Sequence, residues 1–146
     1  MNVEKSASFA LPASAIFRVI TNFQTKSSWQ TDVLEAYLVS PGLLQQGASV
    51  FQARTYGGRR NETTLIISEY VQDRQLTLET PINERPRARE SYHIKPLSEQ
   101  ECRLSFQLEL DGIPPVLTFL VRQVIATTMV SSLERLQALL AKQGQK

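Results

Sequence analysis

Apolar and polar residues alternate through most of the first 111 positions, with short turn-forming segments between the runs. Alternation with a period of two is typical of strands that bury one face. The pattern predicts strands at residues 3–10, 32–40, 48–56, 62–71, 74–80, 87–95 and 101–111. Gly57-Gly58 predicts a tight hairpin turn, because both glycines accept a positive φ, and Pro41-Gly42 predicts a break between two strands.

Two short helical segments interrupt this series after the first strand. Residues 13–21 follow Pro12 and carry apolar side chains at helical spacing. The sequence of residues 23–29 predicts one or two further helical turns, with Phe23 and Trp29 as the apolar residues that anchor them.

The spacing changes again after Asp111, where residues 115–142 predict one long helix. Pro114 and Pro115 suit a first helical turn, which does not need their missing amide hydrogens. Apolar residues then recur at three- and four-residue steps, at Phe119, Ala126, Met129, Val130, Leu133, Leu136 and Leu140. The first half of this helix is apolar around almost its whole circumference. Such a surface is buried, is shared with a partner, or lies against a ligand.

We expect this helix to stay out of a membrane, because Arg122 interrupts its apolar residues before they reach the roughly 18 that a span requires. A long helix that follows an antiparallel sheet instead predicts an α+β container. The sheet curls, the helix lies across it, and an apolar interior remains between them.

Composition narrows the possible functions. The 146 residues are enough for one domain, and 16 basic against 14 acidic residues leave too small an excess to indicate nucleic-acid binding. A single cysteine, Cys102, cannot form an intramolecular disulfide, and the N-terminus lacks the pattern of a secretory signal, so we expect a cytoplasmic protein. One histidine and one cysteine cannot build an ordinary zinc site, and we expect no metal or cofactor.

Several segments resemble those of a known family. They are residues 11–20, Asn22-Phe23 with Trp29, and residues 47–51, 67–71 and 133–136. Together they resemble the helix-grip fold of the START and Bet v 1 superfamily, most closely its polyketide cyclase/dehydrase-like lipid-binding group. The resemblance implies a single domain over residues 1–146, with a curved antiparallel sheet of about seven strands wrapped around the C-terminal helix. Members of the superfamily range from cyclases to binders of quinones, lipids and hormones.

Alternation indicates which strand residues face the interior. Cys102, Leu104 and Phe106 share one face of the last strand, and Tyr92 carries Glu90 inward with it on the strand before. The strand at 62–71 has apolar residues on both faces, so the pattern leaves Glu69 unassigned.

Arg122 lies within about 20° of the centre of the helix's apolar stripe when each residue turns by 100°. Facing inward, it would pair with Glu90, Glu69 or a ligand, with Tyr92 and Tyr56 as further donors. Alternatively, it extends to the rim with its stem on apolar neighbours. The candidate ligand-binding residues are Arg122, Glu90, Tyr92, Tyr56, Glu69, Phe106, Phe119 and Met129.

The leading hypothesis is the binding of a hydrophobic small molecule, such as a lipid, a quinone or a polyketide, between sheet and helix. A second hypothesis is a cyclase or dehydratase in which Arg122, Glu90 and tyrosines polarise a ketone. A third is a partner-binding module or homodimer that pairs through the first half of the long helix. Alternation places His93, the only histidine, on the outer face, which argues against serine–histidine–acid catalysis.

Overall fold

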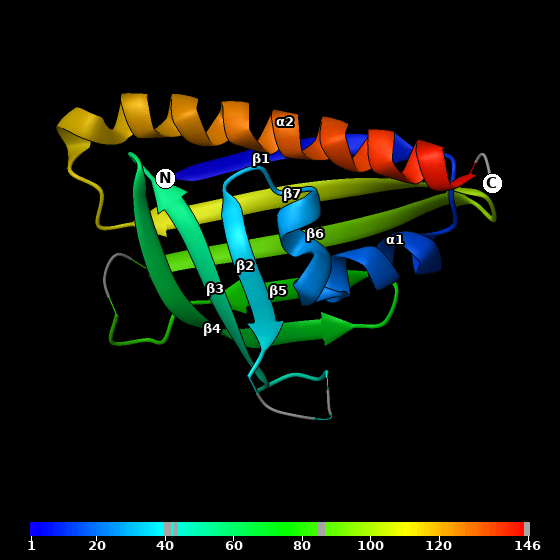
Figure 1. The fold of residues 1–146 in the computed structure, drawn as a ribbon, viewed down its shortest axis with the longest axis horizontal. Coiled ribbons are helices and arrows are strands. Elements are labelled where there is room, and N and C mark those ends of the chain that lie inside the picture. The colour runs from blue at the N-terminus through cyan, green and yellow to red at the C-terminus, as the bar shows by residue number, and fades with distance from the viewer. Residues whose placement is uncertain (40–41, 43, 85–86, 145–146) are drawn as a thin grey trace.

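A computed structural model of the protein describes residues 1–39, 42, 44–84 and 87–144. Within these residues the chain forms one seven-stranded sheet, three short helical segments and one long helix (Figure 1). The strands are β1 (Asn2–Phe9), β2 (Val33–Leu38), β3 (Ser49–Tyr56), β4 (Arg59–Val71), β5 (Gln75–Glu79), β6 (Arg87–Ser98) and β7 (Glu101–Asp111). The helical segments are α1 (Ala13–Thr21), η1 (Phe23–Ser28), η2 (Pro115–Leu117) and α2 (Thr118–Gly144).

The sheet is antiparallel throughout, and its strands lie in the order β1-β7-β6-β5-β4-β3-β2. The first strand therefore pairs with the last, in a register that joins Asn2 to Glu109 and Phe9 to Cys102. The sheet curves beneath α2, which runs along β1 on one side of the molecule (Figure 1). This is the α+β helix-grip fold that the sequence predicted.

Most predicted elements match the observed ones closely. α1 and β7 have the predicted bounds, and Gly57 and Gly58 form the β3–β4 turn with φ of 55° and 79°. β6 runs three residues further than predicted, to Ser98, because a register shift after Pro96 lets the proline sit in the strand. The predicted strand end at Ser40 and the break at Pro41 lie outside the described residues.

The core lies between the concave face of the sheet and the helices. α1 contributes Ile16, Phe17 and Ile20, all buried. Trp29, just after η1, packs edge-on against Tyr92 and Phe106, with ring centroids 6.3 and 6.4 Å apart. From α2, Met129, Leu133, Leu136 and Leu140 complete the core.

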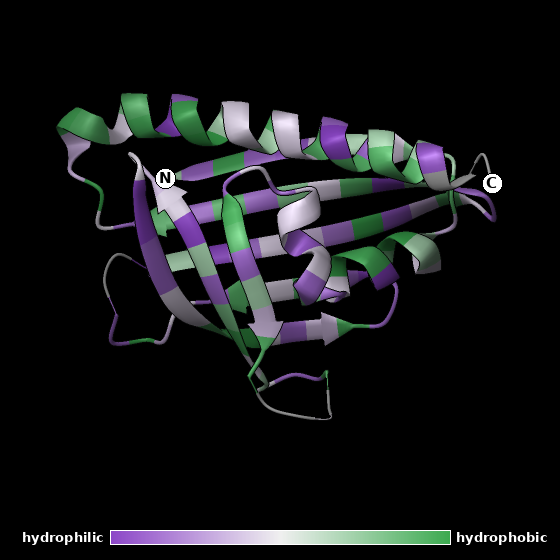
Figure 2. Cartoon of the chain, viewed as in Figure 1, coloured by the Kyte–Doolittle hydropathy of each residue, from purple (hydrophilic) through white to green (hydrophobic). Residues whose placement is uncertain are grey.

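The two halves of α2 have different surroundings. The second half packs on the sheet, whereas Phe119, Leu120 and Val124 in the first turns stay largely exposed, as does Val116 in η2 just before them. Figure 2 shows this apolar start of the helix at the end that extends past the sheet. By length and composition, Pro115–Lys142 qualifies as a membrane span. Its most apolar 18-residue stretch has a mean hydropathy of 1.5, and 17% of that stretch is buried. The interruption by Arg122 is therefore too weak a ground for the prediction that this helix cannot span a membrane. The core helix of a soluble protein passes the same test.

Candidate functional site

A cavity of about 580 Å³ lies between the first half of α2 and strands β3, β4, β6 and β7. Apolar side chains form most of its wall, at Leu65, Ala88, Leu108, Leu110, Ile113, Leu120, Val121, Val124 and Ile125. Gln52, Arg54 and Glu90 form a polar end, and the other polar residues of the lining are Tyr56, Asn61, Glu62, Thr63, Thr80 and Glu84. The cavity thus combines a largely apolar wall with a buried polar end, which is the usual composition of a small-molecule site.

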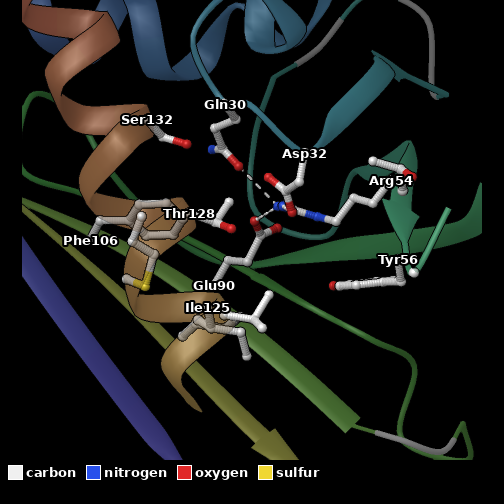
Figure 3. Close-up of a pocket in the computed structure, with 14 residues that line it drawn as sticks. Gln30, Asp32, Arg54, Tyr56, Glu90, Phe106, Ile125, Thr128 and Ser132 are labelled. Carbon is white, nitrogen blue, oxygen red and sulfur yellow. Dashed lines mark hydrogen bonds and ion pairs between the residues drawn. The ribbon is translucent and has the colours of Figure 1, made fainter. Parts of the chain in front are cut away.

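A second, smaller cavity of about 100 Å³ adjoins this polar end. It shares Arg54, Tyr56 and Glu90 with the large cavity, and adds Phe106, Thr128, Met129 and Ser132 at its wall. Figure 3 shows Gln30, Asp32, Arg54 and Glu90 pointing toward one another beside this space. The two cavities therefore meet at one cluster of polar residues.

Glu90 is the centre of this cluster, although its side chain is only 3% exposed. Its carboxylate forms an ion pair with Arg54 and accepts hydrogen bonds from Lys26 at 3.4 Å and from Gln52 at 3.4 Å. The hydroxyl group of Tyr92 donates to the same carboxylate at 3.3 Å. Buried charges need such partners, because an isolated carboxylate in an apolar interior is strongly disfavoured.

Arg54 links Glu90 to a second carboxylate. Its Nη1 donates to Asp32 at 2.6 Å, and its Nη2 donates to Gln30 Oε1 at 3.0 Å. Gln30 is itself buried and donates to the Tyr92 hydroxyl oxygen at 2.6 Å. On the other side of Glu90, Lys26 donates to Gln52 Oε1 at 2.5 Å. The described side chains thus form one continuous network.

The network fixes the charges of its members. Burial alone would raise the pKa of the Glu90 carboxyl group, but Arg54 and Lys26 outweigh burial and hold that pKa below its ordinary value. Burial disfavours the charged guanidinium of Arg54, yet Glu90 and Asp32 outweigh it and raise its pKa. Burial lowers the pKa of Lys26 to about 8, with Glu90 opposing the shift. At neutral pH the cluster therefore holds two cations opposite its carboxylates.

Strand alternation explains how these residues meet. Gln52, Arg54 and Tyr56 share one parity on β3, the face that begins with the buried Val50. Glu90 pairs with Leu78 and Leu108 on its two neighbouring strands, so it lies in the middle of the concave face. Lys26 reaches the same point from η1, where it is buried with Phe23.

The structure brings together five of the eight candidate residues named from the sequence. Glu90, Tyr56, Phe106 and Met129 line one or both cavities. Tyr92 faces inward as predicted but lies behind the cavity wall, where its hydroxyl group accepts a hydrogen bond from Gln30 and donates one to Glu90. Their role in binding a ligand stays a prediction.

Three other candidates do not lie at the cavities. Arg122 and Phe119 are exposed, because other residues of this part of α2 face the cavity, namely Val121, Val124 and Ile125. Of the two positions left open for Arg122, the inward one is therefore excluded in this structure and the exposed one is observed. Glu69 faces outward and pairs with Arg89 at 3.3 Å. A register shift between Ile67 and Glu69 reverses the alternation of β4, which explains why both faces of that strand carry apolar residues.

Sequence reasoning missed Lys26, Gln30, Asp32, Gln52 and Arg54. The parity of β3 carried a usable signal, since Gln52 and Arg54 interrupt an inward face that starts at Val50. No comparable signal marked Lys26, which lies on a short 3₁₀ segment without a periodic pattern. Among the described residues, no group of three or more His, Cys, Asp or Glu side chains is arranged to hold a metal ion.

A curved antiparallel sheet, a long C-terminal helix and a cavity between them together define the class of START-like helix-grip proteins. The chain belongs to the polyketide cyclase / dehydrase and lipid transport family, whose model matches residues 1–141. None of the curated proteins compared with the chain matches it.

Solved structures show the same fold at low sequence identity. A START superfamily protein from Mycobacterium smegmatis is 13% identical, with 97% of each chain covered and a TM-score of 0.81. The Zhui aromatase/cyclase from Streptomyces sp. R1128 is 12% identical, with 94% of this chain and 92% of that chain covered and a TM-score of 0.75. Major latex-like protein 151 from Panax ginseng is 9% identical, with 94% and 95% covered and a TM-score of 0.69.

Proposed function

We propose that the protein binds a hydrophobic small molecule, such as a lipid, a quinone or a polyketide, in the cavity beneath the first half of α2. The observation that carries this proposal is an apolar chamber of about 580 Å³ that ends at a buried cluster of polar side chains. Such a chamber accepts the apolar part of a ligand, while a few fixed polar groups orient its head. The family description, which includes lipid transport, supports the same reading.

Titration with N-phenyl-1-naphthylamine, an uncharged apolar fluorophore, tests this proposal. We expect saturable binding with one site per chain. Thr63→Phe introduces a ring at the cavity wall and is expected to weaken the binding roughly fivefold or more. Thr64→Phe is the matched control, because Thr64 is exposed and does not line the cavity. Absence of saturable binding, or equal effects of the two variants, would contradict the proposal.

Catalysis of the cyclase or dehydratase kind is a second candidate, favoured by the presence of Glu90 and Arg54 at the cavity. General acid–base catalysis works best with a group whose pKa lies near the working pH. Glu90 is instead held as a carboxylate, and its oxygens already accept bonds from Lys26, Gln52, Arg54 and Tyr92. It has no proton to give, and its accepting positions are occupied. Lys26, whose pKa of about 8 lies nearer to neutrality, lines neither cavity, so both groups favour binding over catalysis.

A further inference from the structure

The polar end of the cavity is electrically balanced. Its two cations, Lys26 and Arg54, contact two carboxylates, Glu90 and Asp32. Arg54 contacts both carboxylates directly, so its positive charge is already compensated by the protein. A ligand that brought its own negative charge to this point would leave that charge buried without a counter-ion.

Hydrogen bonding at the polar end points to an acceptor on the ligand. The guanidinium of Arg54 donates through Nη1 and Nη2, and no described residue accepts a hydrogen bond from its Nε. Arg54 lines both cavities, so it keeps a donor for a ligand oxygen. Glu90, by contrast, already accepts from four side chains and has little capacity left for a ligand cation.

We infer that the cavity selects uncharged amphiphiles with a carbonyl-type acceptor and discriminates against carboxylates, with Glu90 and Asp32 as the residues that set this preference. The inference rests on the proposed function, since it names the ligand class of the same cavity. A charged guanidinium in an apolar pocket would ordinarily indicate an anionic ligand. Here the protein supplies the anions itself.

Displacement of bound N-phenyl-1-naphthylamine by three amphiphiles with similar chains tests the inference at neutral pH. The amphiphiles are methyl decanoate, decanoate and decylammonium, which carry an uncharged, an anionic and a cationic head. We expect methyl decanoate to bind about tenfold or more tightly than either charged compound. Equal or tighter binding of decanoate or decylammonium would overturn the inference and leave the proposed function standing. Failure of the fluorophore itself to bind would overturn the proposed function, and the inference with it.

Charge-neutralising variants then test the assigned residues. Glu90→Gln leaves the cluster with one uncompensated cation, so decanoate is expected to bind about tenfold or more tightly while methyl decanoate changes less than about threefold. Asp32→Asn makes the same change at a less buried position and keeps the test available if Glu90→Gln does not fold. Glu69→Gln is the matched control on the outer face, and it should change neither affinity. Unchanged decanoate binding in both cluster variants would overturn the assignment of Glu90 and Asp32.

Discussion

The two halves of α2 belong to one continuous helix but have different structural roles. The second half covers the packed core, where Leu136 is 1% exposed and Leu133 and Leu140 pack beside it. The first half covers the cavity, where Leu120 is 61% exposed although it also lines the chamber wall. Similar apolar sequence therefore stabilises the fold at one end of the helix and encloses space at the other. The role of an apolar helix is therefore decided by what it packs against, and not by its hydropathy alone.

The largest expected effect comes from shortening one leucine in each half. Leu136→Ala removes a fully buried side chain and is expected to lower the free energy of unfolding by about 2–5 kcal/mol. Leu120→Ala removes the same atoms from a mostly exposed position and is expected to change it by less than about 1 kcal/mol. Urea unfolding followed by the emission of Trp29, the only tryptophan and a buried one, measures both values. Equal losses would mean that the first half also packs on a core.

An intermediate effect is expected from the charge cluster beneath the cavity. Because burial lowers the pKa of Lys26 to about 8 from 10.5, folded chains release this proton before unfolded chains do. Between these pH values the unfolded state binds more protons, so the free energy of unfolding contributed by Lys26 rises as pH rises. Below about pH 8 both states are protonated, and the burial of the charge weakens the fold by its full amount.

Lys26→Met removes this titration and most nearly keeps the shape of the side chain. The difference in free energy of unfolding between the natural protein and Lys26→Met is expected to grow, in favour of the natural protein, by on the order of 1–3 kcal/mol from about pH 8 to about pH 10.5. Urea unfolding at both ends of this range measures it, and the comparison cancels the titration of other groups. Parallel profiles for the two proteins would show that Lys26 keeps its proton throughout.

The fold could be predicted from the sequence because it rests on repeated patterns. Alternation set the parity of β6 and β7, so Glu90, Tyr92 and Phe106 were placed inward correctly. The turn at Gly57-Gly58 and the bounds of α1 depend on local residues alone. Each of these features repeats or is local, and a single sequence contains enough information to find it.

The site was only partly predictable because it depends on contacts between distant segments. Lys26 and Glu90 are 64 positions apart, and nothing near Lys26 in the sequence indicates that it is buried. The position of Arg122 was left open for a different reason. Helical periodicity gives the face on which a residue lies, but it does not tell whether the sheet extends far enough to cover that face.

The smallest effect is therefore expected at Arg122, which lies in the exposed first half of α2. It is exposed, lines neither cavity described here, and forms no ion pair with a described residue. Arg122→Ala is expected to change the affinity for N-phenyl-1-naphthylamine by less than about twofold and the free energy of unfolding by less than about 0.5 kcal/mol. The same titration and urea unfolding measure both quantities. A tenfold loss of affinity would show that the first half of α2 turns inward when a ligand binds, and would restore Arg122 as a ligand contact.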